Sequence, residues 1–340
     1  MQTVLITGAT SFVGAHLCLA FRDAGWKVVA ARSKQDGAYS GIQADRLAAI
    51  SDDTTPAVFD VTHAGEVADA AQQFAPDVWI HHAGYATDHT SVNFELTRGL
   101  AVNAGSIPPL FNALAGGSCG VIVTGTEAEY PIGESPRRED MAGTPRSLYG
   151  LSKLAETIAA EQFSALTGVA TRVARLFLPV GLLDHPGKLL PQVISALRAG
   201  EPIALSECCQ ERDILTVEDV AAAYVFLACD LVRGGFDTVN VASGEARKLS
   251  DLLCELAVHM GADISLLKFG AISMRVGEPR RIVADITKIQ NRGWKPTVNF
   301  LPRLAQLHSQ SSVGSALDMQ KEKPSSYHVP GTQTGNFGRQ

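Results

Sequence analysis

The sequence predicts an α/β protein built on a doubly wound parallel sheet, with a smaller lobe toward the C-terminus. Short apolar runs alternate along the chain with segments in which apolar residues recur at helical spacing. The runs are apolar almost throughout, which indicates strands buried on both faces, as in parallel sheets covered by helices. The chain has 340 residues and is 46% hydrophobic, enough for one large domain or two closely packed ones.

The chain opens on a predicted strand at 4–7, which Gly8 ends. A helix follows with Val13 and Leu17 on its inner face, and Gly25 stops it. Further apolar runs predict the later strands at 27–31, 58–60, 78–82, 121–124, 171–177, 214–217 and 238–241.

A long helix is predicted to open near Leu148 and to end near Gly168. We expect its inner face to carry Leu151, Leu154, Ala155 and Ile158. From 309 to 340 the composition shifts to Ser, Gln, Gly, Lys and Pro without an apolar period, which predicts a disordered tail.

Composition argues against several classes of protein. A net charge of −6 gives no overall basic footprint for nucleic acid, and no apolar run is long enough to span a membrane. The N-terminus enters a strand within three residues and lacks the pattern of a signal peptide. The six cysteines show no metal-ligand spacing, so we expect no metal and a reduced, cytoplasmic protein.

The turn between the first strand and the first helix predicts a dinucleotide-binding site. Gly8 ends the strand and Gly14 lies inside the helix, with Ser11 between them where a third Gly is usual. Backbone N–H groups and the helix dipole then point at a pyrophosphate. The predicted cofactor contacts here are Gly8, Ser11, Phe12, Val13 and Gly14.

The residues after the second strand indicate which nicotinamide cofactor is preferred. A carboxylate at that place would accept a hydrogen bond from the ribose 2′-hydroxyl, but this chain has Arg32, Ser33 and Lys34. A guanidinium binds phosphate in a fork, so NADP(H) is predicted over NAD(H). Asp60 and Val61, after the third strand, are predicted to contact the adenine.

Tyr149 and Lys153 predict the chemistry. They lie four residues apart on the long helix, hence on one face and one turn apart. An ammonium beside a phenol favours the phenolate and is expected to lower the pKa of the tyrosine. Such a tyrosine can exchange a proton with an alcohol or a carbonyl oxygen. A hydroxyl from Thr124 or Thr126, at the end of the fifth strand, can bind the same oxygen.

These motifs together resemble the extended short-chain dehydrogenase/reductases, in their nucleotide-sugar epimerase/dehydratase/reductase branch. The resemblance covers residues 1 to about 308. It is carried in family order by Thr7-Gly8…Gly14, His82-Ala-Gly84, Asn103, Tyr149…Lys153, 212–220, 240–245, 281–285 and 293–296.

The resemblance implies roles for the matched residues. Tyr149 would be the proton donor, Lys153 would hold the nicotinamide ribose and lower the tyrosine pKa, and the register selects Thr126 over Thr124. It further implies cofactor contacts from His82, Ala83, Gly84 and Asn103, and a nucleotide-diphosphate site at Arg212 and Arg275. Leu178 stands where relatives have a substrate-binding Asn, so the substrate pose is open. A homodimer through the Tyr149 helix and the helix near Asn103 is also implied.

The residues after Thr126 separate the branches of this family. Dehydratases carry a Glu two residues after the Thr and bifunctional epimerase-reductases a Cys, whereas this chain has Ala128. Glu127 and Glu129 are expected to point to the other side of an extended segment. The resemblance therefore implies NADPH-dependent reduction of the C4 ketone of a nucleotide-activated 4-keto-6-deoxy sugar. A nucleotide-sugar 4-epimerase and a non-catalytic NADP-sensing protein remain alternatives.

The resemblance also implies a division into two interleaved lobes. Residues 1–177 and 213–242 would form a Rossmann domain that binds the cofactor. Residues 178–212 and 243–308 would form a smaller lobe that binds the substrate.

Overall fold

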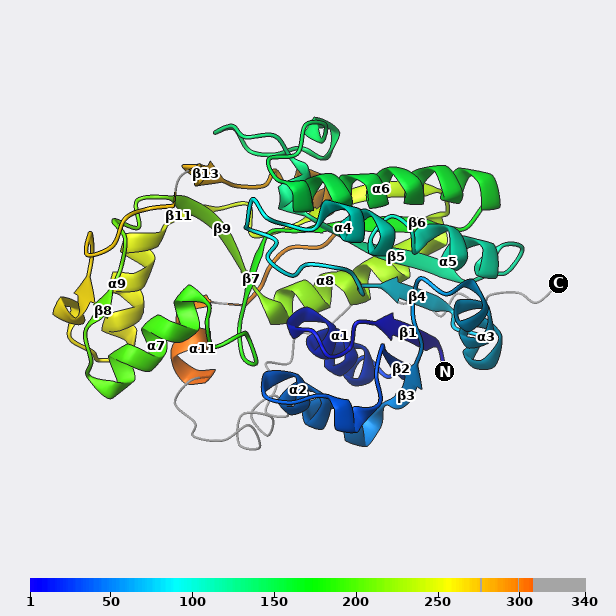
Figure 1. The fold of residues 1–340 in the computed structure, drawn as a ribbon, viewed down its shortest axis with the longest axis horizontal. Helices are drawn as coiled ribbons and strands as arrows, with labels where there is room; N and C mark the ends of the chain where they lie inside the picture. Colours follow the sequence, from blue (N-terminus) through cyan, green and yellow to red (C-terminus); the bar gives the residue numbers. More distant parts are fainter. Residues whose placement is uncertain (276, 299, 308–340) are drawn as a thin grey trace.

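The computed structural model describes residues 1–275, 277–298 and 300–307, and Figure 1 shows their arrangement. The predicted tail, 309–340, lies outside these residues. The larger part of the molecule is a parallel sheet covered by helices on both faces, and a smaller part with its own short strands lies beside it.

The central sheet confirms the predicted doubly wound fold. Its strands lie in the order β10-β6-β5-β4-β1-β2-β3, and every neighbouring pair is parallel. The strands are β1 (Thr3–Thr7), β2 (Lys27–Arg32), β3 (Thr55–Val58), β4 (Val78–His81), β5 (Gly120–Thr126), β6 (Thr171–Leu176) and β10 (Phe236–Val241). The order reverses at β1 and β4, where ligands bind in sheets of this kind.

The third strand differs from its prediction. We expected it at 58–60, but β3 begins at Thr55 and ends at Val58. Pro56 argues against a strand when the sequence alone is considered, because proline cannot donate a backbone hydrogen bond to a neighbouring strand. It is accommodated here because β3 is at the edge of the sheet and pairs only with β2.

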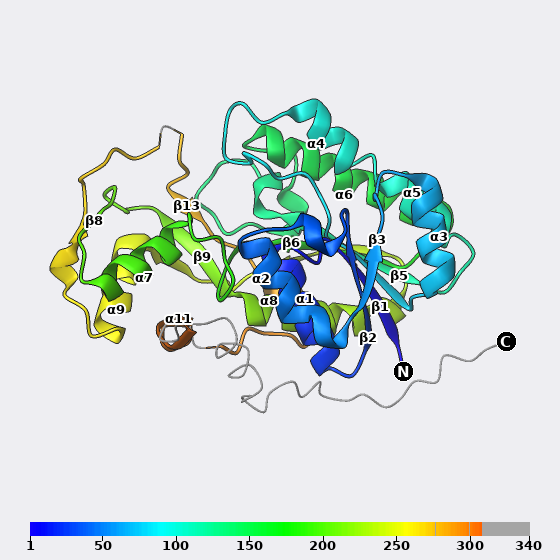
Figure 2. The same cartoon turned by 60° about the horizontal axis from the view of Figure 1, so that its bottom comes forward.

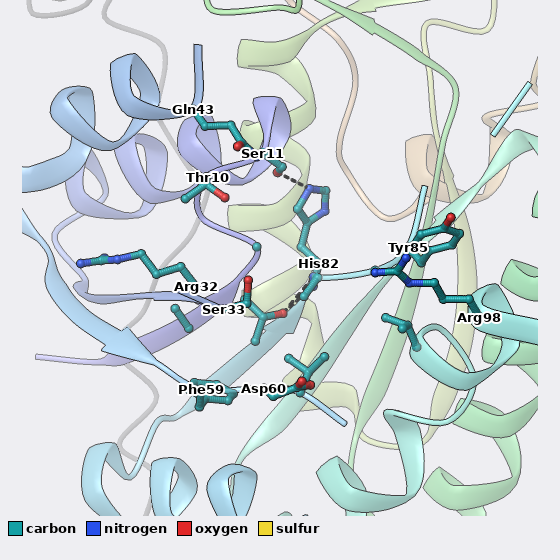
Figure 3. Close-up of a pocket in the computed structure, with 17 residues that line it drawn as sticks. Thr10, Ser11, Arg32, Ser33, Gln43, Phe59, Asp60, His82, Tyr85 and Arg98 are labelled. Carbon is teal, nitrogen blue, oxygen red and sulfur yellow. Dashed lines mark hydrogen bonds between the residues drawn. The ribbon is translucent and has the colours of Figure 1, made fainter. Parts of the chain in front are cut away.

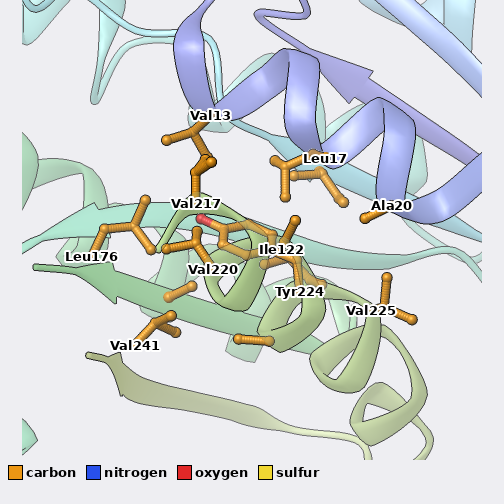
Figure 4. Close-up of a cluster of buried hydrophobic side chains, with 14 of the residues drawn as sticks. Val13, Leu17, Ala20, Ile122, Leu176, Val217, Val220, Tyr224, Val225 and Val241 are labelled. Atoms are coloured by element: carbon orange, nitrogen blue, oxygen red, sulfur yellow. The ribbon is translucent and has the colours of Figure 1, made fainter. Parts of the chain in front are cut away.

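Helices cover both faces of the sheet (Figure 2). One face carries α1 (Phe12–Asp23), α2 (Ile42–Ile50) and α8 (Val217–Asp230). The other carries α3 (Ala64–Phe74), α4 (Leu96–Val102), α5 (Ile107–Leu114) and α6 (Leu148–Thr167). In Figure 4, Val13 and Leu17 of α1 pack against Val220 and Tyr224 of α8 above Ile122 of β5.

Helix α6 presents the opposite face from the one we predicted. Leu151 is 40% exposed and Ile158 is 51% exposed, so neither faces the core. The buried residues of α6 are mainly small or polar: Gly150, Ser152, Lys153, Glu156, Thr157, Ala160 and Ser164. The apolar period of this helix therefore marks its outer face, and its inner face holds polar groups.

Among the described residues, the smaller part contains short strands and helices of its own. Its strands are β7 (Leu178–Val180), β9 (Glu211–Thr216), β11 (Ala246–Lys248) and β13 (Arg281–Ile282), with β8 (Ile203–Ala204) paired to β12 (Leu267–Lys268). Its helices are α7 (Leu189–Ala199), α9 (Leu249–His259) and α11 (Phe300–Leu307), whereas α10 (Thr287–Asn291) packs against β10 of the central sheet. Strand β9 crosses the predicted lobe boundary at residue 213, and the division into lobes stays a prediction.

Short 3-10 turns join several elements. They are η1 (Asp36–Ala38), η2 (Ser51–Asp53), η3 (Glu127–Glu129), η4 (Glu139–Met141), η5 (Leu231–Arg233) and η6 (Ile264–Leu266). Within the described ranges, the helices are all too short or too polar to cross a membrane.

Candidate active site

The turn between β1 and α1 leaves its backbone open to a ligand. Gly8 has φ of +74°, and a Cβ there would lie 3.1 Å from the backbone of Ala83. A Cβ on Gly14 would collide with the carbonyl oxygen of Gly8. The Ser11 hydroxyl caps α1 by accepting from the N–H of Gly14 at 2.9 Å. These glycines are therefore required by geometry, and the turn fits a pyrophosphate at the helix N-terminus.

A cavity of about 410 Å³ lies against this turn (Figure 3). Among the predicted cofactor residues, its lining includes Gly8, Ser11, Arg32, Ser33, Asp60, Val61, His82, Ala83 and Gly84. Residues from several elements that are distant in sequence thus meet around one cavity, as expected for an extended dinucleotide.

Other predicted cofactor residues lie away from the cavity wall. Phe12 and Val13 are buried in the core, and Gly14 is inside α1. Lys34 is exposed outside the lining. Asn103 is buried, with its Oδ1 accepting from the backbone N–H of Tyr85 at 2.7 Å.

The sequence analysis missed further polar residues of this cavity, among them Gln43, Tyr85 and Arg98. Arg98 lies over the Tyr85 ring, with its guanidinium carbon 4.8 Å from the ring centroid. Each is a single polar residue on a helix or loop, so only the fold shows that they share a cavity.

Arg32 ends β2 as predicted, but its guanidinium is engaged. The side chain is buried, forms an ion pair with Asp36, and donates from Nη1 to the carbonyl of Ala30 at 3.3 Å. Figure 3 shows Arg32 extending away from His82. Its Nε has no hydrogen-bond partner among the described residues. A phosphate at this place would therefore compete with the Asp36 carboxylate for the guanidinium.

His82 joins this cavity to a second one. Its Nε2 is 2.9 Å from the Ser11 hydroxyl, and its Nδ1 is 2.9 Å from the Thr124 hydroxyl. Thr124 in turn is 2.7 Å from the Tyr224 hydroxyl. Burial, assisted by the charge of Lys153, lowers the pKa of His82 to about 4, so the ring is neutral near pH 7. This chain of hydrogen bonds ties the glycine turn between β1 and α1 to the end of β5.

The second cavity, of about 480 Å³, brings the predicted catalytic hydroxyls together. Thr126 and Tyr149 line the same space, with Ala128 in its wall. Thr124 also lines it, but its hydroxyl is already bonded to His82 and Tyr224. Thr126 Oγ1 accepts from the N–H of Ala128 at 3.3 Å, which leaves its proton free to donate into the cavity. This arrangement favours Thr126, the choice made from the family register.

Lys153 acts on the pKa of Tyr149 in the predicted direction, but the net shift is a rise. Burial raises the pKa of Tyr149, and Lys153 only partly offsets this rise. The carboxylates of Glu156, Glu129 and Glu127 add to it. Lys153 is not a bare charge beside the phenol, because it forms a buried ion pair with Glu156 one turn along α6.

Glu156 is a residue that the sequence analysis missed. Burial raises its pKa to about 7, although Lys153 acts in the other direction. Its Oε1 lies 3.8 Å from Nε2 of His81, whose pKa burial lowers to about 3. The spacing of Lys153 and Glu156 is a signal of contact, because residues three apart meet on a helix.

The segment after Thr126 is not extended as we predicted. It forms the 3-10 turn η3, with Thr126 as its N-cap. Glu127 and Ala128 both line the cavity, whereas Glu129 is completely buried behind it. Glu127 is bound by Arg146 in an ion pair. A carboxylate therefore does face the cavity beside Ala128, because a tight turn abolishes the alternation of a strand.

The outer part of the cavity carries cations. Of the predicted substrate residues, Arg212, Arg275 and Leu178 all line it. Arg212 is buried in an ion pair with Glu278, and Leu178 is 38% exposed at the start of β7. Lys188 adds a positive charge that sequence analysis missed. Within the described ranges, no three His, Cys, Asp or Glu residues are grouped to hold a metal.

Comparisons with known proteins identify the family and several relatives of this chain. Residues 4–242 match the model of the NAD dependent epimerase/dehydratase family. The chain is 24% identical to GDP-6-deoxy-D-mannose reductase of Pseudomonas aeruginosa, over 91% of this chain and 96% of that protein. It is 25% identical to UDP-glucose 4-epimerase of Azospirillum brasilense, over 99% and 97%.

A solved structure shares the fold over nearly its whole length. It is dTDP-glucose 4,6-dehydratase from Streptomyces venezuelae with NAD bound, at a TM-score of 0.76 and 22% identity. The alignment covers 95% of this chain and 98% of that one. With its open glycine turn, its Tyr149 and Lys153 on one helix, and a family match over most of its length, the chain belongs to the NAD dependent epimerase/dehydratase family, the extended short-chain dehydrogenase/reductases.

Proposed function

We propose that this protein reduces the C4 ketone of a nucleotide-activated 4-keto-6-deoxy sugar, with NADPH as the cofactor. The observation that carries the proposal is the meeting of Thr126 and Tyr149 in a cavity that shares His82 with the glycine-turn cavity. A relative over nearly the whole chain is a GDP-6-deoxy-D-mannose reductase. Ala128, which cannot move a proton, supports plain reduction over dehydration.

Residues of the two cavities have different roles in the proposed reaction. A nicotinamide cofactor held at the glycine-turn cavity would supply the hydride for the carbonyl carbon. Tyr149 gives its phenolic proton to the carbonyl oxygen, and the free proton of Thr126 orients that oxygen. Lys153 lies one turn from Tyr149 on α6, and its charge favours the phenolate that proton transfer leaves. Arg212 and Arg275 face the anionic diphosphate of the substrate.

A 4-epimerase is the second candidate. A relative that aligns with 99% of this chain is a UDP-glucose 4-epimerase. The two activities differ in whether NADPH is consumed. The experiment is therefore NADPH oxidation against GDP-, dTDP-, CDP- and UDP-4-keto-6-deoxy sugars, with product stereochemistry. Net oxidation supports the reductase, and sugar inversion without oxidation supports the epimerase. Cofactor binding with neither reaction would indicate a sensor.

Solvent deuterium tests the proposed branch more sharply. In heavy water, we expect no enzyme-dependent deuterium at C3 or C5 of the product, because Ala128 offers no acid or base. Glu127 is the group that threatens this expectation, since it lines the cavity, but both of its carboxylate oxygens are already bound by the guanidinium of Arg146. Mass spectrometry of the product, corrected for exchange of the free ketone, provides the measurement. Deuterium at either carbon would contradict plain reduction.

Cofactor preference follows from Arg32. NADPH is expected to bind more tightly than NADH, by the about 1–3 kcal/mol typical of hydrogen bonds to charged groups. Arg32→Asp should reverse or abolish the preference. Asp36→Asn should strengthen the preference for NADPH, because in the native protein the Asp36 carboxylate forms an ion pair with the Arg32 guanidinium and competes with the phosphate. Fluorescence titration gives the dissociation constants.

Lys34→Ala is the matched control for this series. Lys34 neighbours Arg32 in sequence but is exposed outside the cavity lining, so its loss should change either constant little. Equal dissociation constants for NADPH and NADH in the native protein would remove the basis of the preference.

We expect a homodimer through α4 and α6. These helices pack on each other and expose Leu100, Leu148, Leu151 and Ile158, each between 36% and 51% accessible. An outward apolar face on helices that also carry the active site is typical of a subunit interface. Light scattering at micromolar protein should give twice the chain mass, and Ile158→Glu should shift it toward the monomer. A monomeric native protein would contradict the proposal.

A further inference from the structure

His89 is a titratable side chain of the second cavity that the proposed mechanism leaves unused. It lies in the segment between β4 and α4 and lines the cavity next to Thr90. Its ring contacts that of Tyr149 edge to face, with the centroids 5.6 Å apart and the planes at 66°. Phe94 contacts Tyr149 in a similar way, with the centroids 5.8 Å apart.

The hydrogen bonds of His89 fix its tautomer. Its Nδ1 lies 3.2 Å from the carbonyl oxygen of Ala86, and its backbone N–H donates to the same oxygen at 3.3 Å. A carbonyl can only accept, so Nδ1 carries the proton in this contact. In the neutral ring Nε2 is then an acceptor, and it has no hydrogen-bond partner among the described residues.

The charges around His89 favour the neutral ring. Burial lowers the pKa of His89, and the cations Lys188 and Arg275 lower it further. The Ala86 carbonyl and the Glu127 carboxylate act in the other direction but do not outweigh them. Near neutral pH the ring therefore offers one acceptor nitrogen at the wall of the cavity that Tyr149 also lines.

We propose that His89 is a substrate-binding residue, whose Nε2 accepts a hydrogen bond from a ring hydroxyl of the sugar held at Tyr149. The inference rests on the proposed function and deepens it. A sugar whose ketone oxygen faces Tyr149 carries its remaining hydroxyl groups on neighbouring carbons, within reach of a side chain that touches the same phenol. The cavity would thus select a sugar that has a hydroxyl donor facing Nε2 of His89. This selection would add to the binding of the diphosphate by the cations of the cavity.

The test is His89→Phe, which keeps an aromatic ring against Tyr149 and removes the acceptor. With the 4-keto-6-deoxy sugar nucleotide that the native enzyme uses best, KM should rise about threefold to tenfold, the scale of one neutral hydrogen bond. The inhibition constant of the free nucleoside diphosphate should not change, because it lacks the sugar. Phe94→Leu, which removes the other ring on Tyr149, serves as the matched packing control.

The pH profile separates this role from packing. In the native enzyme KM should rise as pH falls through the lowered pKa of His89, since the protonated ring can no longer accept. This acid limb should disappear in His89→Phe and persist in Phe94→Leu. If an active His89→Phe enzyme keeps the native KM, or keeps the rise of KM at low pH, the proposed role of His89 is wrong while the proposed function stands. Absence of NADPH oxidation by the native enzyme with every sugar would instead overturn the proposed function and the inference together.

Discussion

Tyr149→Phe is expected to bind NADPH normally and to lose turnover by roughly a hundredfold or more, the scale for a positioned general acid. The phenyl ring keeps the contacts with His89 and Phe94 but has no proton to give. Stopped-flow or steady-state NADPH oxidation measures the loss, and cofactor fluorescence checks binding. Thr126→Val should cost less, because it removes an orienting group and leaves the acid in place.

The pH dependence of turnover follows from the same residue. Reduction needs the protonated phenol, and burial with the nearby carboxylates raises the pKa of Tyr149 above its ordinary value of about 10. The acid form is therefore complete at neutral pH and is lost only as pH rises through that raised value. We expect kcat to show no basic limb attributable to Tyr149 between pH 7 and about 9. Near-normal turnover in Tyr149→Phe would remove the residue from this role.

Features that depend on one element were predictable from the sequence. The order of strands and helices, the glycine turn, and the pair Tyr149 and Lys153 each follow from a local period or spacing, and the structure shows each of them. Arg32 was placed correctly at the end of β2 for the same reason.

Features that depend on a partner from elsewhere were not predictable. The sequence does not show that the Asp36 carboxylate forms an ion pair with the Arg32 guanidinium. Nor does it show that carboxylates from η3 and α6 raise the pKa of Tyr149. The inverted face of α6 has the same origin, because Lys153 and Glu156 neutralise each other and can be buried, which leaves the leucines outside. Apolar periodicity finds the more hydrophobic face of a helix, which on α6 is the outer one.

A large loss of stability is expected when Glu129 is substituted. This residue is a completely buried carboxylate behind Thr126, the proposed catalytic threonine. Its Oε2 accepts from Nε of Arg175 at 2.8 Å and from the Thr157 hydroxyl at 2.9 Å. Its Oε1 accepts from the backbone N–H of Thr126 at 2.8 Å. One charge thus ties β5, α6 and β6 together and holds the catalytic turn in place.

Glu129→Gln is expected to lower the free energy of unfolding by about 3–5 kcal/mol, because it leaves the buried guanidinium of Arg175 without its countercharge. Urea unfolding followed by circular dichroism measures the change. Glu161→Gln, on the exposed side of α6, is the matched control and should change stability by less than about 0.5 kcal/mol. The double variant Glu129→Leu with Arg175→Met should recover much of the loss, since removing both charges leaves neither one buried alone. A Glu129→Gln protein as stable as the native one would show that Arg175 finds another partner, and that the turn carrying Thr126 does not depend on this ion pair.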